Sequence, residues 1–373
     1  MLLNPGRTAY GPDDRRLIGA VHAAEAQALL DLCPAHRPTP LLSLPILAAE
    51  LGVGTVQLKA EWGRMGLGSF KALGGAYAVA LRVLARAEAA LGRPLGPQDL
   101  STFEVRAVAR GLTVICASAG NHGLAVAAGA RAFGARAVVV LAETVPEAFA
   151  VRLGERGATV VRAGGDYEAS MAHAMDEAAR QGWTLVSDSS WPGYVDTPLQ
   201  VMRGYSVLLA EAAEAMEAAG GPATHVFVQA GVGGLAAAAA GYLRDRWGEA
   251  PRLVVVEPWG APCLLESVRA GRPVEVAGAA TALGRLDCKA PSLLAFQLLQ
   301  RLADGFILVS DAEAEAAARR LTALGAPVSP CGAAGAAGLM GLDAEARREL
   351  DLDAGSRVLL IGTEGAIEPG SRP

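Results

Sequence analysis

Thr-Val-Ile-Cys-Ala-Ser-Ala-Gly-Asn-His-Gly, residues 113–123, is the stretch in which a strand pattern gives way to a helix pattern. Its β-branched first half predicts a buried strand, and a helical pattern over 124–133 follows its polar end. The same alternation recurs along the chain. Strand-like apolar runs lie at 56–58, 137–141, 159–161, 184–186, 226–228, 253–256, 307–309 and 358–361, and further helical patterns at 167–181 and 197–218. Because the apolar runs alternate with helices, we expect an α/β fold of mostly parallel, twisted sheets covered by helices on both faces.

Length and charge exclude several classes of protein. The chain has 373 residues, 52% of them hydrophobic and 19% charged, and a formal net charge of −5. A chain of this length usually forms two domains, and its negative charge predicts neither a nucleic-acid nor a membrane-surface partner. The most apolar helical stretch, 235–243, is about half of the ~20 residues that a membrane span requires. Residues 1–16 lack the apolar segment of a signal peptide, so we expect a cytoplasmic protein.

Metal-binding patterns are missing from the sequence. The five cysteines form no Cys-x-x-Cys pair, and the five histidines form no His-x-x-x-His or His-Glu-x-x-His motif. Isolated cysteines are typical of small buried apolar side chains in a reducing compartment. We therefore expect no metal site.

Lys71 lies in the segment Gly-Ser-Phe-Lys-Ala-Leu-Gly-Gly-Ala-Tyr, residues 68–77, between a short apolar stretch and a glycine-rich turn before a helix. We expect such a lysine to face inward, where partial desolvation lowers its pKa and frees the amine for Schiff-base formation. A lysine that extends its charge to solvent is the alternative, and it is the commoner one among lysines in general.

The loop after the strand that ends at residue 116 is a candidate substrate site. It opens a helix, whose first peptide N–H groups and positive dipole end attract an anion such as a carboxylate. Asn121 is able to donate a hydrogen bond to a neighbouring oxyanion. Simple capping of the helix by Ser118 or Asn121 is the alternative, and it explains this loop, taken alone, as well as ligand binding does. The candidate binding residues are Ser118, Ala119, Gly120, Asn121 and His122.

A second loop, Gln-Ala-Gly-Val-Gly-Gly-Leu at 229–235, again separates a strand pattern from an alanine-rich helix. Its glycines allow the backbone to approach a phosphate and direct successive N–H groups at it. It matches neither the Walker motif nor the dinucleotide motif, and a tight turn without function would explain it equally well. The candidate phosphate-binding residues are Gly231, Val232, Gly233, Gly234 and Leu235.

The end of the last strand pattern supplies a fourth polar group. Thr363 or Glu364 follows the apolar run 358–361, where a hydroxyl or carboxylate faces a ligand in many sheets of this class, although a loop without function is the alternative. A Schiff-base lysine, a carboxylate loop, a phosphate loop and a group for a ring nitrogen are together what pyridoxal 5'-phosphate requires.

These motifs resemble those of the fold type II family of pyridoxal-phosphate enzymes, which includes threonine and serine dehydratases and tryptophan synthase β. The resemblance covers nearly the whole chain, from His-Arg-Pro-Thr-Pro-Leu at 36–41 to the last strand. Within the family the chain most resembles the diaminopropionate ammonia-lyases. The segments that carry this resemblance are 69–77, 188–194 (Asp-Ser-Ser-Trp-Pro-Gly-Tyr), 202–205, 229–233 and 363–365.

Two departures bear on the substrate. Diaminopropionate ammonia-lyases typically have an aspartate where this chain has Ala119, so that 118–121 resembles threonine dehydratase instead. A Gly-Glu-Ser-Gly segment of the family appears here as Gly-Ala-Ala-Gly, residues 332–335. A serine/threonine or hydroxyaspartate dehydratase is therefore the alternative enzyme, and a non-catalytic amino-acid sensor is a further one that the intact Lys71 argues against.

The resemblance implies β-elimination from a small amino acid. Lys71 would hold the cofactor and act as the general base. Asp188 would pair with a β-ammonium group or assist proton transfer to or from it, although a helix N-cap or turn residue is its alternative role. Asn121 would contact the cofactor and Thr363 its ring nitrogen. The resemblance also implies a homodimer, a larger domain of residues 1–78 plus 201–373 that anchors the cofactor, and a smaller domain of residues 79–200. Cys263 and Cys288 would lie close together, with a disulfide between them left open.

Overall fold

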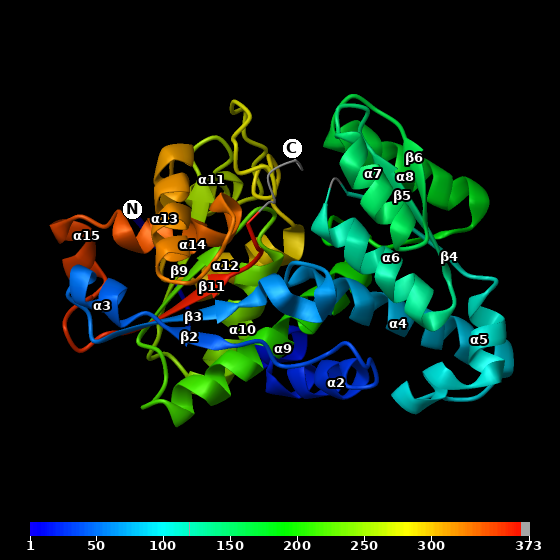
Figure 1. The fold of residues 1–373 in the computed structure, drawn as a ribbon, viewed down its shortest axis with the longest axis horizontal. Helices are drawn as coiled ribbons and strands as arrows, with labels where there is room; N and C mark the ends of the chain where they lie inside the picture. The colour runs from blue at the N-terminus through cyan, green and yellow to red at the C-terminus, as the bar shows by residue number, and fades with distance from the viewer. Residues whose placement is uncertain (119, 367–373) are drawn as a thin grey trace.

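The computed structural model describes residues 1–118 and 120–366. Within these residues the strands form two sheets, one of seven strands in the order β1-β10-β9-β8-β11-β3-β2 and one of four in the order β6-β5-β4-β7. The small sheet is parallel throughout, and in the large sheet only the outer pairs β1·β10 and β2·β3 are antiparallel. Figure 1 shows the two sheets in separate lobes, with α4 running between them. The expected α/β class is confirmed.

The strands are β1 Leu2–Leu3, β2 Leu41–Ser43, β3 Thr55–Ala60, β4 Thr113–Ala117, β5 Arg136–Leu141, β6 Ala158–Arg162, β7 Thr184–Leu185, β8 His225–Gln229, β9 Arg252–Pro258, β10 Gly305–Val309 and β11 Arg357–Gly362. Each of the predicted strands is present. The sequence patterns missed β1 and β2, because a two- or three-residue strand that pairs along only one edge is too short to show periodicity.

The α-helices are α1 Pro12–Leu17, α2 Ala20–Leu30, α3 Pro45–Leu51, α4 Lys71–Leu91, α5 Phe103–Ala109, α6 Asn121–Phe133, α7 Glu147–Glu155, α8 Tyr167–Gln181, α9 Asp196–Ala218, α10 Gly234–Trp247, α11 Cys263–Ala270, α12 Leu293–Leu302, α13 Asp311–Ala323, α14 Pro330–Met340 and α15 Ala344–Glu349. Two 3₁₀ helices, η1 Glu61–Gly66 and η2 Pro97–Ser101, join them. No helix among the described residues is long and apolar enough to cross a membrane.

The central strands of each sheet are buried on both faces, as their sequence patterns predict, whereas the outer strands β2, β6 and β7 are partly exposed. On β8, Val226 and Val228 join the core on one face with α9 and α10, whereas Phe227 joins a second core with α13 and α14. On β4, Val114 and Ile115 are divided in the same way, with α8 covering the face of Ile115. Alternate side chains of a strand point to opposite faces, so apolar residues are required at every position.

The start of α4 is fixed by close helix packing. A Cβ atom at Gly204 of α9 would lie 2.7 Å from the Gly74 Cα, and one at Gly75 would lie 2.5 Å from the Ala125 Cβ of α6. The expectation of a glycine-rich turn before this helix was therefore wrong. Gly74 and Gly75 lie inside the first turn of α4, where the missing side chains let α9 and α6 approach and so position Lys71.

The residues of the two lobes can be compared with the predicted domains. The small sheet and its helices fall between residues 103 and 185, inside the predicted smaller domain of 79–200. Helix α4 packs against α6 of one lobe and α9 of the other, so it crosses the predicted boundary at residue 78. The boundaries themselves stay a prediction.

Candidate active site

Lys71 is the first residue of α4 and lies beside the end of β11. The preceding loop is held there because the Phe70 N–H donates to the Thr363 carbonyl oxygen at 3.1 Å. The Lys71 ammonium contacts the Asp188 carboxylate directly. The lysine nitrogen also lies 5.4 Å from the ring centre of Phe70 and 5.7 Å from that of Tyr205. The structure therefore brings together the two residues that we assigned to catalysis.

The protonation of Lys71 differs from the sequence-based expectation. Burial by itself lowers the pKa of Lys71, but attraction to Asp188 and a smaller effect of Tyr205 outweigh it and raise the pKa above 10.5. Burial raises the pKa of Asp188, but Lys71 and His122 outweigh it and hold that pKa well below its ordinary value. The expectation of a lowered lysine pKa was wrong for this state, because it considered desolvation and not a carboxylate 117 positions away.

The loop that carries Asp188 is anchored on both sides. Before it, the Tyr194 hydroxyl donates to the Leu185 carbonyl oxygen at 2.8 Å and accepts from the Ser187 N–H at 3.0 Å. After it, the hydroxyls of Ser190 and Ser292 are 2.7 Å apart, which ties the loop to the segment before α12. Asp188 does not cap a helix, since α9 begins only at Asp196. Its side chain is fixed toward Lys71.

The glycine-rich loop has the backbone that close approach requires. Gly233 has φ +99°, and a Cβ atom there would lie 2.9 Å from the Ala295 Cβ and 3.0 Å from a Leu264 methyl group. A Cβ atom at Gly231 would lie 2.9 Å from the Cys288 sulfur. Because α10 begins at Gly234, the N–H groups of its first turn have no partner within the helix.

The loop before α6 is partly capped by its own side chain. The Ser118 hydroxyl accepts hydrogen bonds from the Gly120 N–H at 3.2 Å and the Gly123 N–H at 3.0 Å. This leaves the N–H groups of Asn121 and His122 for a ligand, because the first turn of a helix offers them no partner. The Asn121 amide donates to a Glu364 carboxylate oxygen at 2.5 Å. The predicted site residue Ala119 lies outside the described residues.

Comparison with known proteins gives a consistent identification. The sequence model of the family described as "Pyridoxal-phosphate dependent enzyme" matches residues 32–364. The chain belongs to this family. Diaminopropionate ammonia-lyase of Salmonella typhimurium is 33% identical to it over 355 residues, which are 90% of this chain and 87% of the relative.

Solved structures agree with this family assignment. The Escherichia coli diaminopropionate ammonia lyase in complex with an aminoacrylate-PLP azomethine reaction intermediate has a TM-score of 0.86 and 30% identity, covering 97% of this chain and 92% of that one. A chloroplastic threonine dehydratase of Arabidopsis thaliana is 32% identical over 53% of this chain and is thus a more distant relative. The protein is a pyridoxal-phosphate-dependent enzyme of fold type II.

The residues present fit pyridoxal phosphate. The partly buried amine of Lys71, the crowded glycine loop and the hydroxyl of Thr363 lie around one edge of the large sheet, at the ends of β3, β8 and β11. The Thr363 hydroxyl accepts from the Gln229 amide nitrogen at 3.1 Å, so its own proton is free to point at a ring nitrogen. The separate roles of the predicted cofactor and substrate residues stay predictions.

Ser329 and Arg285 were not predicted from the sequence, and both contact Glu364. The Glu364 side chain, which the sequence offered as an alternative to Thr363, is 4% exposed and accepts hydrogen bonds from Asn121 and from the Ser329 hydroxyl, the latter at 2.5 Å. Arg285 lies 3.3 Å from the same carboxylate. Ser329 and Arg285 are not part of any recognisable motif and approach Glu364 from distant loops. Only their contacts in the fold reveal them.

Cys263 and Cys288 were expected to lie close together, with a disulfide between them left open. Cys263 and Cys288 are both free thiols and both lie against Gly231, the first through a contact of 3.6 Å from its sulfur to the Gly231 oxygen. No group of three potential metal-binding side chains occurs among the residues described.

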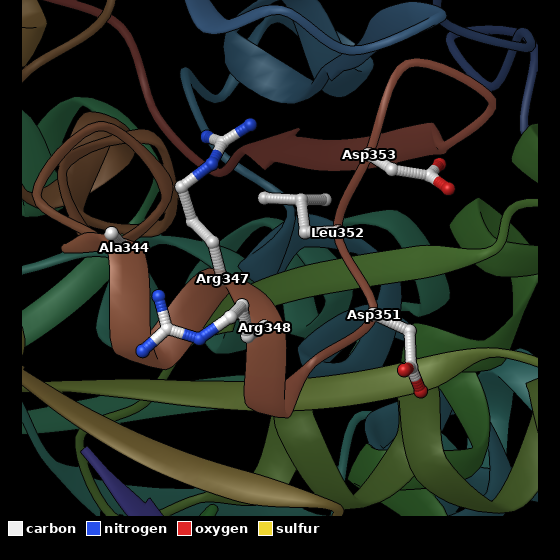
Figure 2. Close-up of a pocket in the computed structure, with 6 residues that line it drawn as sticks. All are labelled: Ala344, Arg347, Arg348, Asp351, Leu352 and Asp353. Atoms are coloured by element: carbon white, nitrogen blue, oxygen red, sulfur yellow. The ribbon is translucent and has the colours of Figure 1, made fainter.

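A surface cavity elsewhere does not belong to this site. The cavity lies at α15 and the turn that follows and has a volume of about 450 Å³. Figure 2 shows the residues that line it, which are Ala344, Arg347, Arg348, Asp351, Leu352 and Asp353. Arg347 donates to the Leu51 carbonyl oxygen at 2.7 Å, and Asp351 pairs with Arg252. None of the predicted site residues lines this cavity.

Proposed function

We propose that the protein is an ammonia-lyase that catalyses β-elimination from 2,3-diaminopropionate, or a close β-substituted amino acid, to pyruvate and ammonia. The observation that carries the proposal is the position of Asp188. Its carboxylate contacts the cationic nitrogen of Lys71, so it lies where a substrate's β-ammonium group would meet it once that lysine is occupied. An ammonium group forms a charge-assisted hydrogen bond with a carboxylate, which a β-hydroxyl does not match.

Each group of residues in the site has a separate role in the proposed reaction. Bound pyridoxal phosphate supplies an electron sink that stabilises negative charge at Cα. Lys71, in its neutral form, takes the Cα proton as general base. The first N–H groups of α6 hold the substrate carboxylate, and those of α10 hold the phosphate. Asp188 orients the β-ammonium group, which leaves as ammonia.

A dehydratase acting on serine, threonine or hydroxyaspartate is the second candidate. The residues that favour it are Ala119 and the Gly-Ala-Ala-Gly segment at 332–335, where the resembled lyases carry carboxylates. A β-hydroxyl needs a proton to leave, whereas a β-ammonium group already carries one, so fewer acidic groups suit the ammonia-lyase as well.

A substrate panel tests the two candidates. Ammonia and oxo-acid release are measured with 2,3-diaminopropionate, serine, threonine and hydroxyaspartate, and 2,3-diaminopropionate is expected to have the highest kcat/KM. The Asp188→Asn variant should lose about 10²-fold in kcat/KM for 2,3-diaminopropionate, from the ~2–5 kcal/mol that a buried charge pair typically loses on truncation. It should lose less for serine, which shares the part of the loss that comes from the contact of Asp188 with Lys71 but has no β-ammonium group to pair with the carboxylate. Equal losses for both substrates would assign Asp188 only to the step at Lys71 that the two reactions share.

Two further proposals concern the setting of the enzyme. We infer a cytoplasmic location, which five free thiols support because they persist in a reducing compartment. A homodimer is proposed on the family resemblance alone, and sedimentation of the purified enzyme tests it.

A further inference from the structure

His122 is a buried histidine beside the catalytic pair. It is the second residue of α6 and is 5% exposed. Its Nε2 lies 2.8 Å from the Val186 carbonyl oxygen. A carbonyl oxygen only accepts hydrogen bonds, so Nε2 must carry the proton, and the other ring nitrogen, Nδ1, is left with an unprotonated lone pair.

This second nitrogen faces Asp188. His122 Nδ1 is buried without a hydrogen-bond partner among the described residues, and it lies 3.9 Å from the Asp188 oxygen that contacts Lys71. A buried acceptor without a donor costs free energy. We therefore expect Nδ1 to gain a hydrogen-bond partner, or a proton, during the reaction. A proton placed between Asp188 and His122 would satisfy both groups at once.

Lys71 needs such a destination for a proton. The lysine must be neutral to bind the cofactor covalently and to act as a base, yet Asp188 raises its pKa. If Lys71 lost its proton to bulk water, the Asp188 carboxylate, which is only 14% exposed, would lose its cationic partner, which is unfavourable. If the proton stays within the cluster on an imidazole, Asp188 keeps a cationic partner.

We propose that His122 is a positioning residue that accepts the proton of Lys71 through Asp188 and returns it in each cycle. In this step one N–H bond of the Lys71 ammonium breaks and an N–H bond forms at His122 Nδ1. The lysine becomes a neutral amine, the imidazole becomes an imidazolium, and Asp188 stays an anion between them. The charge of the three groups together is unchanged. The inference rests on the proposed use of Lys71 as base but not on the identity of the substrate.

The other titratable groups around the pair cannot take this proton. They are Tyr205 of α9, Cys116 of β4, Cys288 of the loop before α12 and Tyr167 of α8. Burial raises the pKa of the first three, to about 12 for Cys288. The pKa of Tyr167 is also raised, although this residue is 40% exposed. All four therefore already hold a proton at neutral pH.

His122 is the remaining acceptor among these groups. Burial lowers its pKa, against the opposing attraction of Asp188, so its Nδ1 is unprotonated and available at neutral pH. The ordinary pKa values of lysine and histidine differ by about 4 units, and the raised pKa of Lys71 and lowered pKa of His122 widen this difference. The transfer is therefore unfavourable by at least about 10⁴-fold and is transient.

The test measures proton loss from Lys71 without any amino-acid substrate. Pyridoxal phosphate is added to the cofactor-free full-length protein, and the rate at which a borohydride-reducible bond to Lys71 forms is followed from pH 6 to pH 10. The variant is His122→Gln. Its amide nitrogen can keep the hydrogen bond to the Val186 carbonyl oxygen, but the side chain has no basic nitrogen to replace Nδ1. The matched control is His225→Gln. His225 is also buried and bonds the Leu350 carbonyl oxygen at 2.8 Å, but its Nδ1 already has Thr224 as a partner at 2.8 Å.

We expect His122→Gln to slow the reaction by about 10²-fold at pH 7, the lower end of general acid–base effects. The difference should shrink as the pH rises and solvent takes the proton instead. His225→Gln should follow the wild-type pH profile. A His122→Gln profile that parallels the wild type, or that is lowered equally at every pH, would overturn the proposal.

A second measurement serves if His122→Gln does not fold. In ¹⁵N-histidine NMR of the wild-type protein, His122 should carry its proton on Nε2 with Nδ1 unprotonated at pH 7. A proton on Nδ1 in that state would refute the proposed acceptor. Because neither measurement uses an amino acid, a failed substrate assignment and a failed role for His122 would be distinguished.

Discussion

Gly233 allows a quantitative test of the phosphate site. In Gly233→Ala the new methyl group would lie 2.9 Å from the Ala295 Cβ and 3.0 Å from a Leu264 methyl group, at a backbone φ of +99°. A left-handed backbone costs an L-residue about 1–2 kcal/mol. Overpacking of a methyl group typically costs about 1–3 kcal/mol more. A loop that relaxes to relieve this strain no longer directs its N–H groups at the phosphate.

The expected loss of cofactor affinity follows from these costs. At ~1.4 kcal/mol per tenfold change in Kd, the combined strain of about 2–5 kcal/mol weakens binding between about 30-fold and several thousandfold. The assay is titration of the cofactor-free protein with pyridoxal phosphate, followed by absorbance, together with the Tm of the cofactor-free protein.

Gly325→Ala is the control for backbone strain alone. Gly325 has φ +88°, but a Cβ atom there would meet nothing within 4 Å, and it lies in the turn after α13, outside the glycine-rich loop before α10. We expect this variant to lose some Tm and to keep its cofactor affinity. Full cofactor affinity in Gly233→Ala, with an unchanged Tm, would show that the phosphate is bound elsewhere.

Three further predictions concern Lys71, Asp188 and Ala119. Lys71→Ala should abolish elimination and borohydride fixation of the cofactor, because it removes the anchor and the base together; a fixed cofactor in this variant, seen by mass spectrometry, would place the Schiff base on another lysine. Asp188→Asn removes the charge that raises the pKa of Lys71, so in the cofactor-free protein the pH at which the lysine becomes reactive should fall. The expected fall is about 3 units, from a charge ~4 Å away at an effective dielectric constant of ~20. An unchanged pH profile would contradict the assigned contact. Since alanine at position 119 cannot accept a proton, L-amino acids should be preferred over D-amino acids by the general-base factor of roughly 10²–10⁴; equal oxo-acid release from the two enantiomers would refute a single base.

Strand and helix patterns predicted the fold because burial determines which residue types occur at consecutive positions of a strand or helix, and this pattern is visible in the sequence. Every residue of β8 and β4 is buried, and the runs 226–228 and 114–116 are apolar at consecutive positions, so they can be recognised without knowledge of the neighbouring strands. The helix over 167–181 is equally visible, because it is amphipathic and an aspartate, Asp166, caps its start. The edge strands β1 and β2 have neither property and were missed.

The electrostatics of the site could not be predicted in the same way. The sequence identified Lys71 and Asp188 separately but gave no measure of the contact between them, which depends on how α4, α9 and the loop after β7 pack. Gly74 and Gly204 determine that packing by letting the two helices approach at their backbones. The contact with Asp188 that raises the pKa of Lys71 thus depends on helix packing at two uncharged glycines. The proton that Asp188 holds on the lysine must be given up each time the amine reacts. This requirement connects the fold to the chemistry: a site that needs a neutral lysine but pairs it with a buried carboxylate also needs a nearby proton acceptor, and the unpartnered nitrogen of His122 is positioned to be one.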